Sequence, residues 1–195
     1  MQTIKVTQSA SGKFAPDRAV FRIELRAEHR KSEQAAKLLQ QTRDGVLRKL
    51  AAAGLREGEV TFRSAGCAAI RKEEKTVFCA YGDLTASLAV DDDRVQRVIA
   101  ALEKSETSWR QSYELQDRSY RKTLMAQAVA AAESDAQTLA CAAGVRLGAL
   151  ACMEYAASFN GGARVLRAMA REESVSALPE PIEATETVTC EWEIA

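Results

Sequence analysis

The stretch that decides the fold is residues 117–148, which read DRSYRKTLMAQAVAAAESDAQTLACAAGVRLG. This alanine-dense run predicts one long helix with a defined start and a defined end. Asp117 or Ser119 is expected to cap its first turn, because a short side-chain oxygen accepts hydrogen bonds from amides that the turn leaves free. Gly144 is expected to end the helix, since glycine adopts the left-handed conformation without a Cβ clash.

Apolar residues of this helix recur at three- and four-residue spacing, which indicates a single apolar face. The predicted stripe consists of Leu124, Ala128, Ala131, Ala132, Leu139, Ala142 and Ala143. The polar residues predicted to point away from it are Arg118, Arg121, Lys122, Gln127, Glu133 and Gln137. Because alanine side chains are short, the stripe is expected to lie close against a sheet.

The chain before this helix contains a short strand predicted over residues 3–7 and then a regular succession of elements. Phe21 and Ile23 begin an alternation of apolar and charged residues that is typical of a strand with one buried face. The succession is strand 19–29, helix 32–53, paired strands 59–70 and 76–90, a short helix after Asp91–Asp93 and a strand over 109–115. Gly45 is expected to lie at a close contact within its helix, and Gly82 to mark a bulge or close backbone approach.

The chain after the long helix is less regular. Residues 149–159 alternate and predict a strand, Asn160–Gly162 is a turn signal, and residues 187–194 predict a closing strand. Residues 163–181 fit an edge strand, a short helix or a partly disordered insertion.

The order of elements predicts an α+β fold with an antiparallel sheet and long helices packed on one face. Strand, helix, strand, strand, helix, strand over about 19–116 is the split βαβ order of ferredoxin-like folds. The helix over about 118–143 and a further strand pair extend this core. We expect a single domain over 1–195, or two intimately joined subdomains over about 1–116 and 117–195.

The composition excludes several classes of function. The 27 basic and 27 acidic residues cancel, so the net excess of cations typical of a nucleic-acid-binding protein is absent. No apolar run reaches the roughly 20 residues that a membrane-spanning helix requires. The first residues, MQTIKVTQSASGKF, lack the apolar core of a secretory signal. A cytoplasmic location is therefore expected for the chain as given, or a periplasmic or secreted one if an upstream signal was removed.

The reactive residues form no recognisable catalytic or metal-binding pattern, so we assign no catalytic, cofactor-binding or metal residues and expect no cofactor. The five cysteines lack a CxxC pair. Four of them lie in apolar or alternating runs and are expected to be free, buried thiols: Cys79, Cys141, Cys152 and Cys190. The lone histidine, His29, is expected to be exposed at a strand end. Asp91–Asp93 predict a helix cap rather than a cation site. Arg164, Arg167 and Arg171 would share one helical face, which favours a solvated surface over an acidic partner.

Several short motifs, in this order along the chain, resemble the SIMPL domain family, a family of unknown function. They are PDRAVFRIELRAE from Pro16, AYGDLTASLAVDDD from Ala80, LMAQAVAAAESDAQTLACAAGVRLG from Leu124 and TVTCEWEI from Thr187. The chain departs from the family pattern in TQSASGKF near its start and in Pro179-Glu180-Pro181. The resemblance implies an α+β fold, assembly into rings or larger oligomers, and members that are often secreted or periplasmic. It brings no established catalytic residues.

The function predicted from these observations is that of a non-enzymatic, self-assembling structural or interaction module. Its expected partner is a second copy of the chain, through strand edges and residues 163–181, because an exposed edge offers unpaired backbone groups. Two alternatives stay open: a binding module for a small apolar or lipid-like molecule, and an enzyme of unrecognised type.

Overall fold

The computed structural model describes residues 2–72, 75–156, 165–166 and 179–194. The chain divides into two compact units, and each is described below by itself. Unit 1 draws on Met1–Ala15, Leu115–Gly162 and Pro179–Ala195, and unit 2 on Pro16–Glu114 and Ala163–Leu178. The alternative division predicted at residue 116 differs from this one in two segments: residues 1–15 group with the C-terminal elements, and residues 163–178 group with unit 2.

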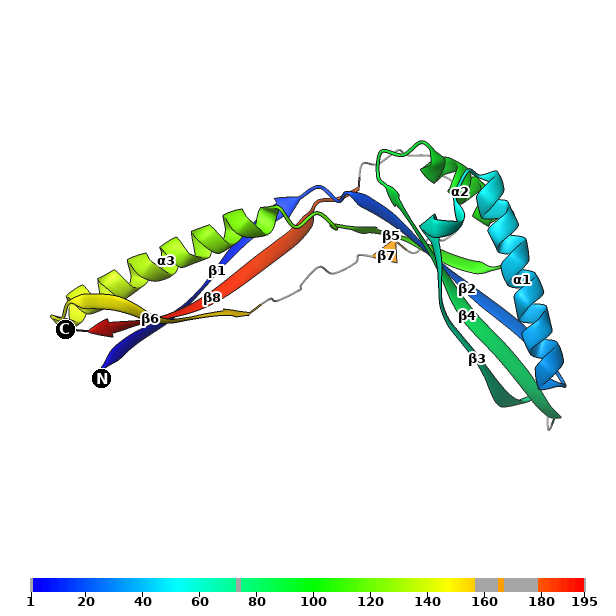
Figure 1. Cartoon of the computed structure of the whole chain (residues 1–195), viewed down its shortest axis with the longest axis horizontal. Coiled ribbons are helices and arrows are strands. Elements are labelled where there is room, and N and C mark those ends of the chain that lie inside the picture. Colours follow the sequence, from blue (N-terminus) through cyan, green and yellow to red (C-terminus); the bar gives the residue numbers. More distant parts are fainter. Residues whose placement is uncertain (1, 73–74, 157–164, 167–178, 195) are drawn as a thin grey trace. The chain divides into compact units, whose positions relative to one another are not determined.

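Unit 2 confirms the split βαβ arrangement (Figure 1). Its elements are β2 (Arg18–His29), α1 (Ser32–Ala52), the 3-10 turn η1 (Glu57–Glu59), β3 (Val60–Lys72), β4 (Lys75–Ala89), α2 (Arg94–Glu103), β5 (Ser108–Glu114) and the two-residue β7 (Val165–Leu166). The strands lie in the order β3-β4-β2-β5-β7, and all of the pairs are antiparallel. The mixed α+β class predicted from the sequence is therefore confirmed.

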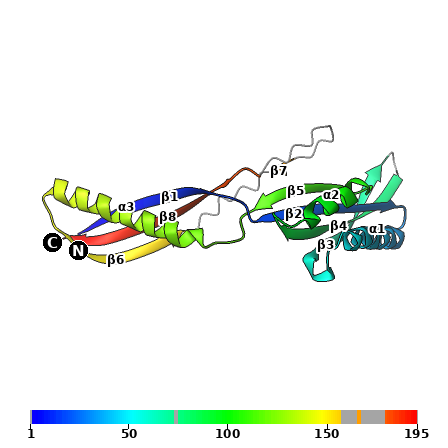
Figure 2. The same cartoon turned by 90° about the horizontal axis from the view of Figure 1, so that it is seen from above.

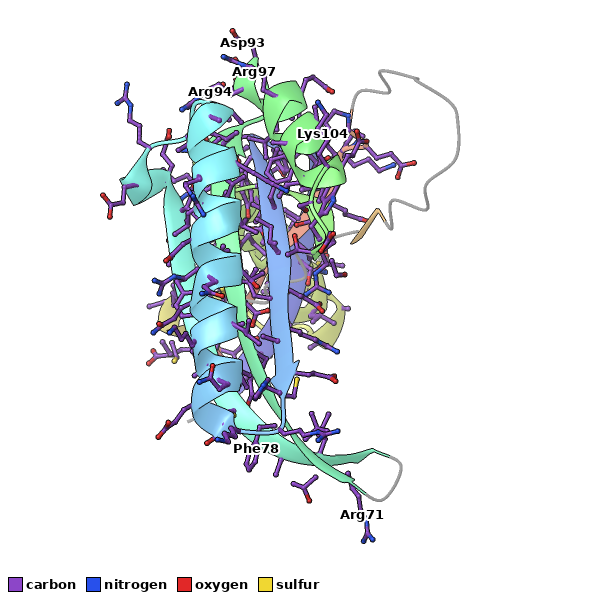
Figure 3. The ribbon with its side chains drawn as sticks, turned by 90° about the vertical axis from the view of Figure 1, so that its right-hand side faces the viewer. Arg71, Phe78, Asp93, Arg94, Arg97 and Lys104 are labelled. Atoms are coloured by element: carbon purple, nitrogen blue, oxygen red, sulfur yellow. The ribbon has the colours of Figure 1, made fainter. Side chains whose placement is uncertain are left out.

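The core of unit 2 forms between its helices and one face of this sheet. Alternation decides which strand residues are buried, because successive side chains point to opposite faces. The core contains large apolar side chains from two strands and two helices. They include Phe21, Ile23 and Leu25 of β2, Leu84 and Leu88 of β4, Leu39 and Leu50 of α1, and Val98 and Leu102 of α2. α1 lies mainly over β2 and β4, and only its margin reaches β3. Figure 3 shows α1 running along the length of the sheet.

Unit 1 contains β1 (Thr3–Phe14), α3 (Tyr120–Ala143), β6 (Leu147–Ala156) and β8 (Ile182–Ile194). Its strands form a separate antiparallel sheet in the order β1-β8-β6, so the fold has two sheets where the sequence predicted one with an added strand pair. α3 lies over β1 and β8, and Figure 2 shows it running along this sheet. Cys190 and Trp192 of β8 are buried beneath its alanines.

Strands β1 and β8 are longer than predicted. β1 extends to Phe14 rather than residue 7, and β8 begins at Ile182 rather than residue 187. The added residues are mostly polar, but hydroxyl pairs hold them together across the two strands. Ser9 pairs with Thr187 at 2.8 Å and Ser11 pairs with Thr185 at 2.8 Å, which compensates for the lack of apolar contact.

The apolar stripe of α3 was predicted partly wrongly. The buried residues follow a strict four-residue spacing: Leu124, Ala128, Ala132, Ala136 and Ala140. The other members of the predicted stripe, Ala131, Leu139, Ala142 and Ala143, are exposed. Ala136 and Ala140 were missed because alanine occupies so many positions of this helix that several faces look equally apolar.

The predicted end of α3 at Gly144 is confirmed, but its N-cap residue, Ser119, makes no side-chain capping hydrogen bond. The close contact expected at Gly45 and the bulge expected at Gly82 are wrong. Gly144 ends α3 with φ of 70°, while Asp117 accepts from the backbone N of Ser119 at 2.9 Å. A Cβ at Gly45 would meet nothing within 4 Å, so no close contact lies there. The sheet irregularity falls between Phe62 and Ser64 of β3, and Gly82 pairs regularly with both neighbouring strands.

Gly144 and Gly45 give a matched pair of stability predictions. Gly144→Ala is expected to lower the free energy of unfolding by about 1 kcal/mol, because alanine disfavours positive φ. Gly45→Ala is expected to raise it by about 0.5–1 kcal/mol, since it lies inside α1 with free space around its Cβ. Urea denaturation of both variants measures the two effects. Equal changes in the same direction would contradict the conformational explanation.

Candidate functional site

Strand β6 is the most unusual surface feature of unit 1. Its sequence, LGALACMEYA, contains a single charge, Glu154, and none of its described side chains is buried. It pairs with β8 on one side, and no described residue pairs with its other edge. Natural sheet edges are usually protected by lysine, proline or a covering element, because an open apolar edge attracts other chains. In the part of the chain that is described, β6 has no lysine, proline or covering element, and its pairing with β8 shifts register on either side of Leu150.

The large apolar side chains of β6 face the helix side of the sheet but remain exposed. Leu150, Met153 and Tyr155 stand opposite Trp192, Cys190 and Val188, whose side chains are buried under α3. The same face of β6 is left uncovered because α3 lies over β1 and β8, and the exposed fractions of these three side chains are 45%, 46% and 38%. We call Leu150, Met153 and Tyr155 the β6 row.

A polar cluster fixes the end of β6 against the first turn of α3. Glu186 of β8 is 4% exposed, and its Oε1 accepts from Arg121 Nε at 2.8 Å. Tyr155 donates its hydroxyl to the other carboxylate oxygen of Glu186 and accepts from Arg121. The hydrogen bond to Glu186, and then burial, raise the pKa of the Tyr155 phenol. Arg121 was predicted to point away from the sheet, and that prediction was wrong, because the buried carboxylate requires a cation.

Unit 2 has an uncovered strand of the same kind. Phe62, Ala65 and Cys67 of β3 stand opposite Leu84, Gly82 and Ala80, on the face that α1 covers over β4. All three are exposed because α1 reaches only the margin of β3. We call Phe62, Ala65 and Cys67 the β3 row.

A hollow of about 260 Å³ separates the β3 row from α1. Its helix side consists of Ala36, Leu39, Gln40 and Arg43, and Arg43 lies over the Phe62 ring at 5.6 Å. On the opposite face of the sheet, Tyr81 lies against Gly66, where an added Cβ would stand 2.9 Å from Tyr81 Cε2. The hollow is mostly apolar and borders the strand edge, since β3 pairs only with β4 among the described residues.

The aspartate run before α2 takes part in an ion cluster. Asp92 accepts from the Arg94 backbone N at 2.9 Å, which confirms the predicted capping role for this one member of the run. The Arg94 guanidinium binds Asp92 and Glu59 at 2.7 and 2.9 Å and donates to the Gly54 carbonyl at 3.1 Å. The side-chain and backbone hydrogen bonds from Arg94 lower the pKa of Asp92 to about 2. Figure 3 shows Arg94, Asp93 and Arg97 at the α2 end of the unit.

This pKa predicts a pH-dependent contribution to stability. The folded pKa of Asp92 lies below its ordinary 3.8, so its stabilising contribution is full above about pH 4 and is lost as the pH falls toward about 2. Asp92→Asn should lower the melting temperature at neutral pH. This difference in melting temperature from the parent chain should shrink and vanish as the pH falls from about 4 to about 2. The exposed neighbour provides the control variant, Asp91→Asn, which should melt like the parent chain. A constant difference down to pH 2 would contradict this role for Asp92.

The remaining candidate residues do not converge on a reactive site. His29 is exposed, and its Nδ1 accepts from the Lys31 backbone N at 3.1 Å. All five cysteines are free, but Cys67, Cys141 and Cys152 are exposed and only Cys190 is buried, so the expectation of buried thiols was largely wrong. Within the described ranges no group of His, Cys, Asp or Glu has the arrangement of a metal site. Arg164, Arg167 and Arg171 lie outside the described residues.

Comparison with known proteins decides the family. The family model described as SIMPL, protein of unknown function (DUF541), matches residues 4–193. The chain belongs to the SIMPL family. The match covers both units of this SIMPL chain, as the resemblance of its motifs implied. A search of curated proteins gave no match. None of the helices in the described portion of this SIMPL protein is long and apolar enough to cross a membrane.

Sequence reasoning missed Glu186 and the two uncovered strands. Glu186 has the same parity as Val188, Cys190 and Trp192, so it lies on the buried face of the closing strand. A charged residue at such a position could have been recognised from the sequence as a candidate for a buried polar contact. The exposure of the β6 and β3 rows had no such signal, because an apolar strand has the same composition whether or not a helix covers it.

Proposed function

We propose that this SIMPL protein is a non-enzymatic module that assembles with copies of itself through its uncovered edge strands. The observation that carries the proposal is β6, an apolar edge strand with no buried side chain among its described residues. Such an edge combines unpaired backbone groups with apolar surface, and both favour association with another chain. The β3 row adds a second surface of this kind on unit 2.

The bond from Tyr155 to Glu186 and Arg121 supports the same proposal. It holds β6 in an extended conformation beside α3 before any partner is present. A strand that is already ordered loses less conformational entropy on binding, which favours association. β6 is therefore a preformed surface rather than a segment that must fold on contact.

Light scattering at micromolar and higher concentrations tests this function. The full chain should form oligomers, and Met153→Lys should shift them toward monomers, because a lysine on an edge strand opposes pairing. The control is Gln137→Lys, which places the same charge at an exposed polar position of α3 and should leave the oligomers unchanged. A chain that stays monomeric throughout this range would overturn the proposal.

The hollow beside α1 favours a second candidate, a binding module for a small apolar molecule. Its volume of about 260 Å³ lies just below the roughly 300–1,000 Å³ usual for ligand sites, and its lining is mostly apolar. Native mass spectrometry of the purified full chain would reveal a retained ligand. An added mass that disappears in the cavity-filling variant Ala65→Phe would favour this candidate over self-assembly.

A further inference from the structure

We propose that β6 of one copy adds as a strand to the open edge of β3 in a second copy. This inference rests on the proposed self-assembly and names its two contacting surfaces. The helix sides of the two sheets would become continuous, so the β6 row would lie beside the β3 row. Met153 and its neighbours would then enter the hollow bordered by Leu39, Arg43 and Phe62.

The surroundings of β3 match a known way of recognising an extended chain. In strand addition, backbone hydrogen bonds to a free edge provide affinity, and an adjacent pocket for alternate side chains provides specificity. β3 offers the free edge in the described structure, and the hollow beside it opens on the face of the β3 row. The side chains that fit best are apolar ones that share one face of the added strand. The β6 row supplies such side chains.

The charges of the two strands favour pairing between β3 and β6 over pairing of either strand with itself. β3 carries Arg63, Arg71 and Lys72 and no acidic residue, and β6 carries Glu154 and no basic residue. Figure 3 places Arg71 at the hairpin end of β3. Two β3 strands side by side would bring together only cations, and two β6 strands only carboxylates, whereas β3 beside β6 combines strands of opposite net charge. The contact is therefore heterologous, meaning that each copy uses one surface to bind and another to be bound.

A heterologous contact has a consequence that a symmetric one lacks. A pair of copies keeps a free β3 edge on one copy and a free β6 edge on the other, so association continues until a ring closes or a filament grows. If one copy has only its β6 edge blocked and the other has only its β3 edge blocked, association should therefore stop at a pair.

The experiment mixes two variants of the full chain, each blocked on one strand. Met153→Lys blocks β6, and Ala65→Lys blocks β3; both positions are exposed, so the fold should be retained. Each variant alone should be monomeric by light scattering, and an equal mixture should contain a species of twice the monomer mass. Circular dichroism and melting temperature establish that both variants are folded. If either is not, Leu150→Lys and Cys67→Lys replace them on the same two rows.

The outcomes separate this inference from the proposed function. An unmodified chain that never assembles overturns both. If the unmodified chain assembles and one of the blocked variants still forms pairs on its own, a strand pairs with itself. That result overturns the heterologous contact only. A mixture that remains monomeric although the unmodified chain assembles also overturns it. A two-chain species found only in the mixture supports the pairing of β3 with β6.

Discussion

Phe21→Ala is expected to lower the free energy of unfolding of unit 2 by about 3–5 kcal/mol. Phe21 is fully buried on β2, in the largest apolar cluster of the unit, and its ring lies 6.4 Å from that of Trp109. Removing the ring deletes its apolar contacts and leaves a cavity that a sheet flanked by two helices cannot close. This loss is a large fraction of the stability of an ordinary domain.

The two tryptophans allow the effect to be assigned to a unit. Trp109 lies in unit 2 and Trp192 in unit 1, and the chain has no other tryptophan. In a Trp192→Phe background, fluorescence during urea denaturation reports on the surroundings of Trp109 alone. The control Phe62→Ala should cost about 1 kcal/mol or less, because Phe62 is 38% exposed and its ring lies at the surface beneath Arg43. Equal losses for Phe21 and Phe62 would contradict the packing described for β2.

Ala132→Leu is expected to destabilise unit 1 by about 1–3 kcal/mol, because the added carbons have no space between α3 and the sheet. Ala132 has no exposed surface and lies in the cluster that contains Val6, Val188 and Trp192. Leucine and alanine are both strong helix formers, so a change in helix propensity cannot account for a loss of this size.

The neighbouring residue provides the matched control for this second prediction. Ala131 lies on the same helix but is exposed, so Ala131→Leu should change stability by no more than about 0.5 kcal/mol. Urea denaturation followed by Trp192 fluorescence in a Trp109→Phe background measures both variants. If Ala131→Leu were the more damaging change, the orientation of α3 on its sheet would be wrong.

Unit 2 was the more predictable part of the fold, because its elements combine large apolar residues with charged ones. In β2, residues such as Phe21 and Ile23 alternate with arginine and glutamate, so the buried face was evident. In α2, Val95, Val98 and Leu102 recur at three- and four-residue spacing and are buried. The strand order then follows from the few arrangements available to a split βαβ chain.

Unit 1 was less predictable for two physical reasons. α3 has alanine on every side, so the spacing of apolar residues did not determine which face packs against the sheet. The second half of β1 is polar, and its strand conformation depends on hydroxyl pairs with β8, which local composition does not reveal. The partnership of Arg121 with Glu186, 65 positions away, depends on tertiary structure in the same way.

The pairing of β1 with β8 also sets the order in which the chain folds during synthesis. Thr3 hydrogen-bonds to Glu191, 188 residues away, so β1 leaves the ribosome long before its partner is made. At the usual rate of about 5–20 residues per second, β1 would wait roughly 10–40 s for β8. Residues 16–114 form most of unit 2 as one continuous segment, and Asp17 N donates to Glu114 O at 3.2 Å near its two ends. Unit 2 is therefore free to fold first, while the polar TQSASGKF of β1 limits aggregation of the waiting strand.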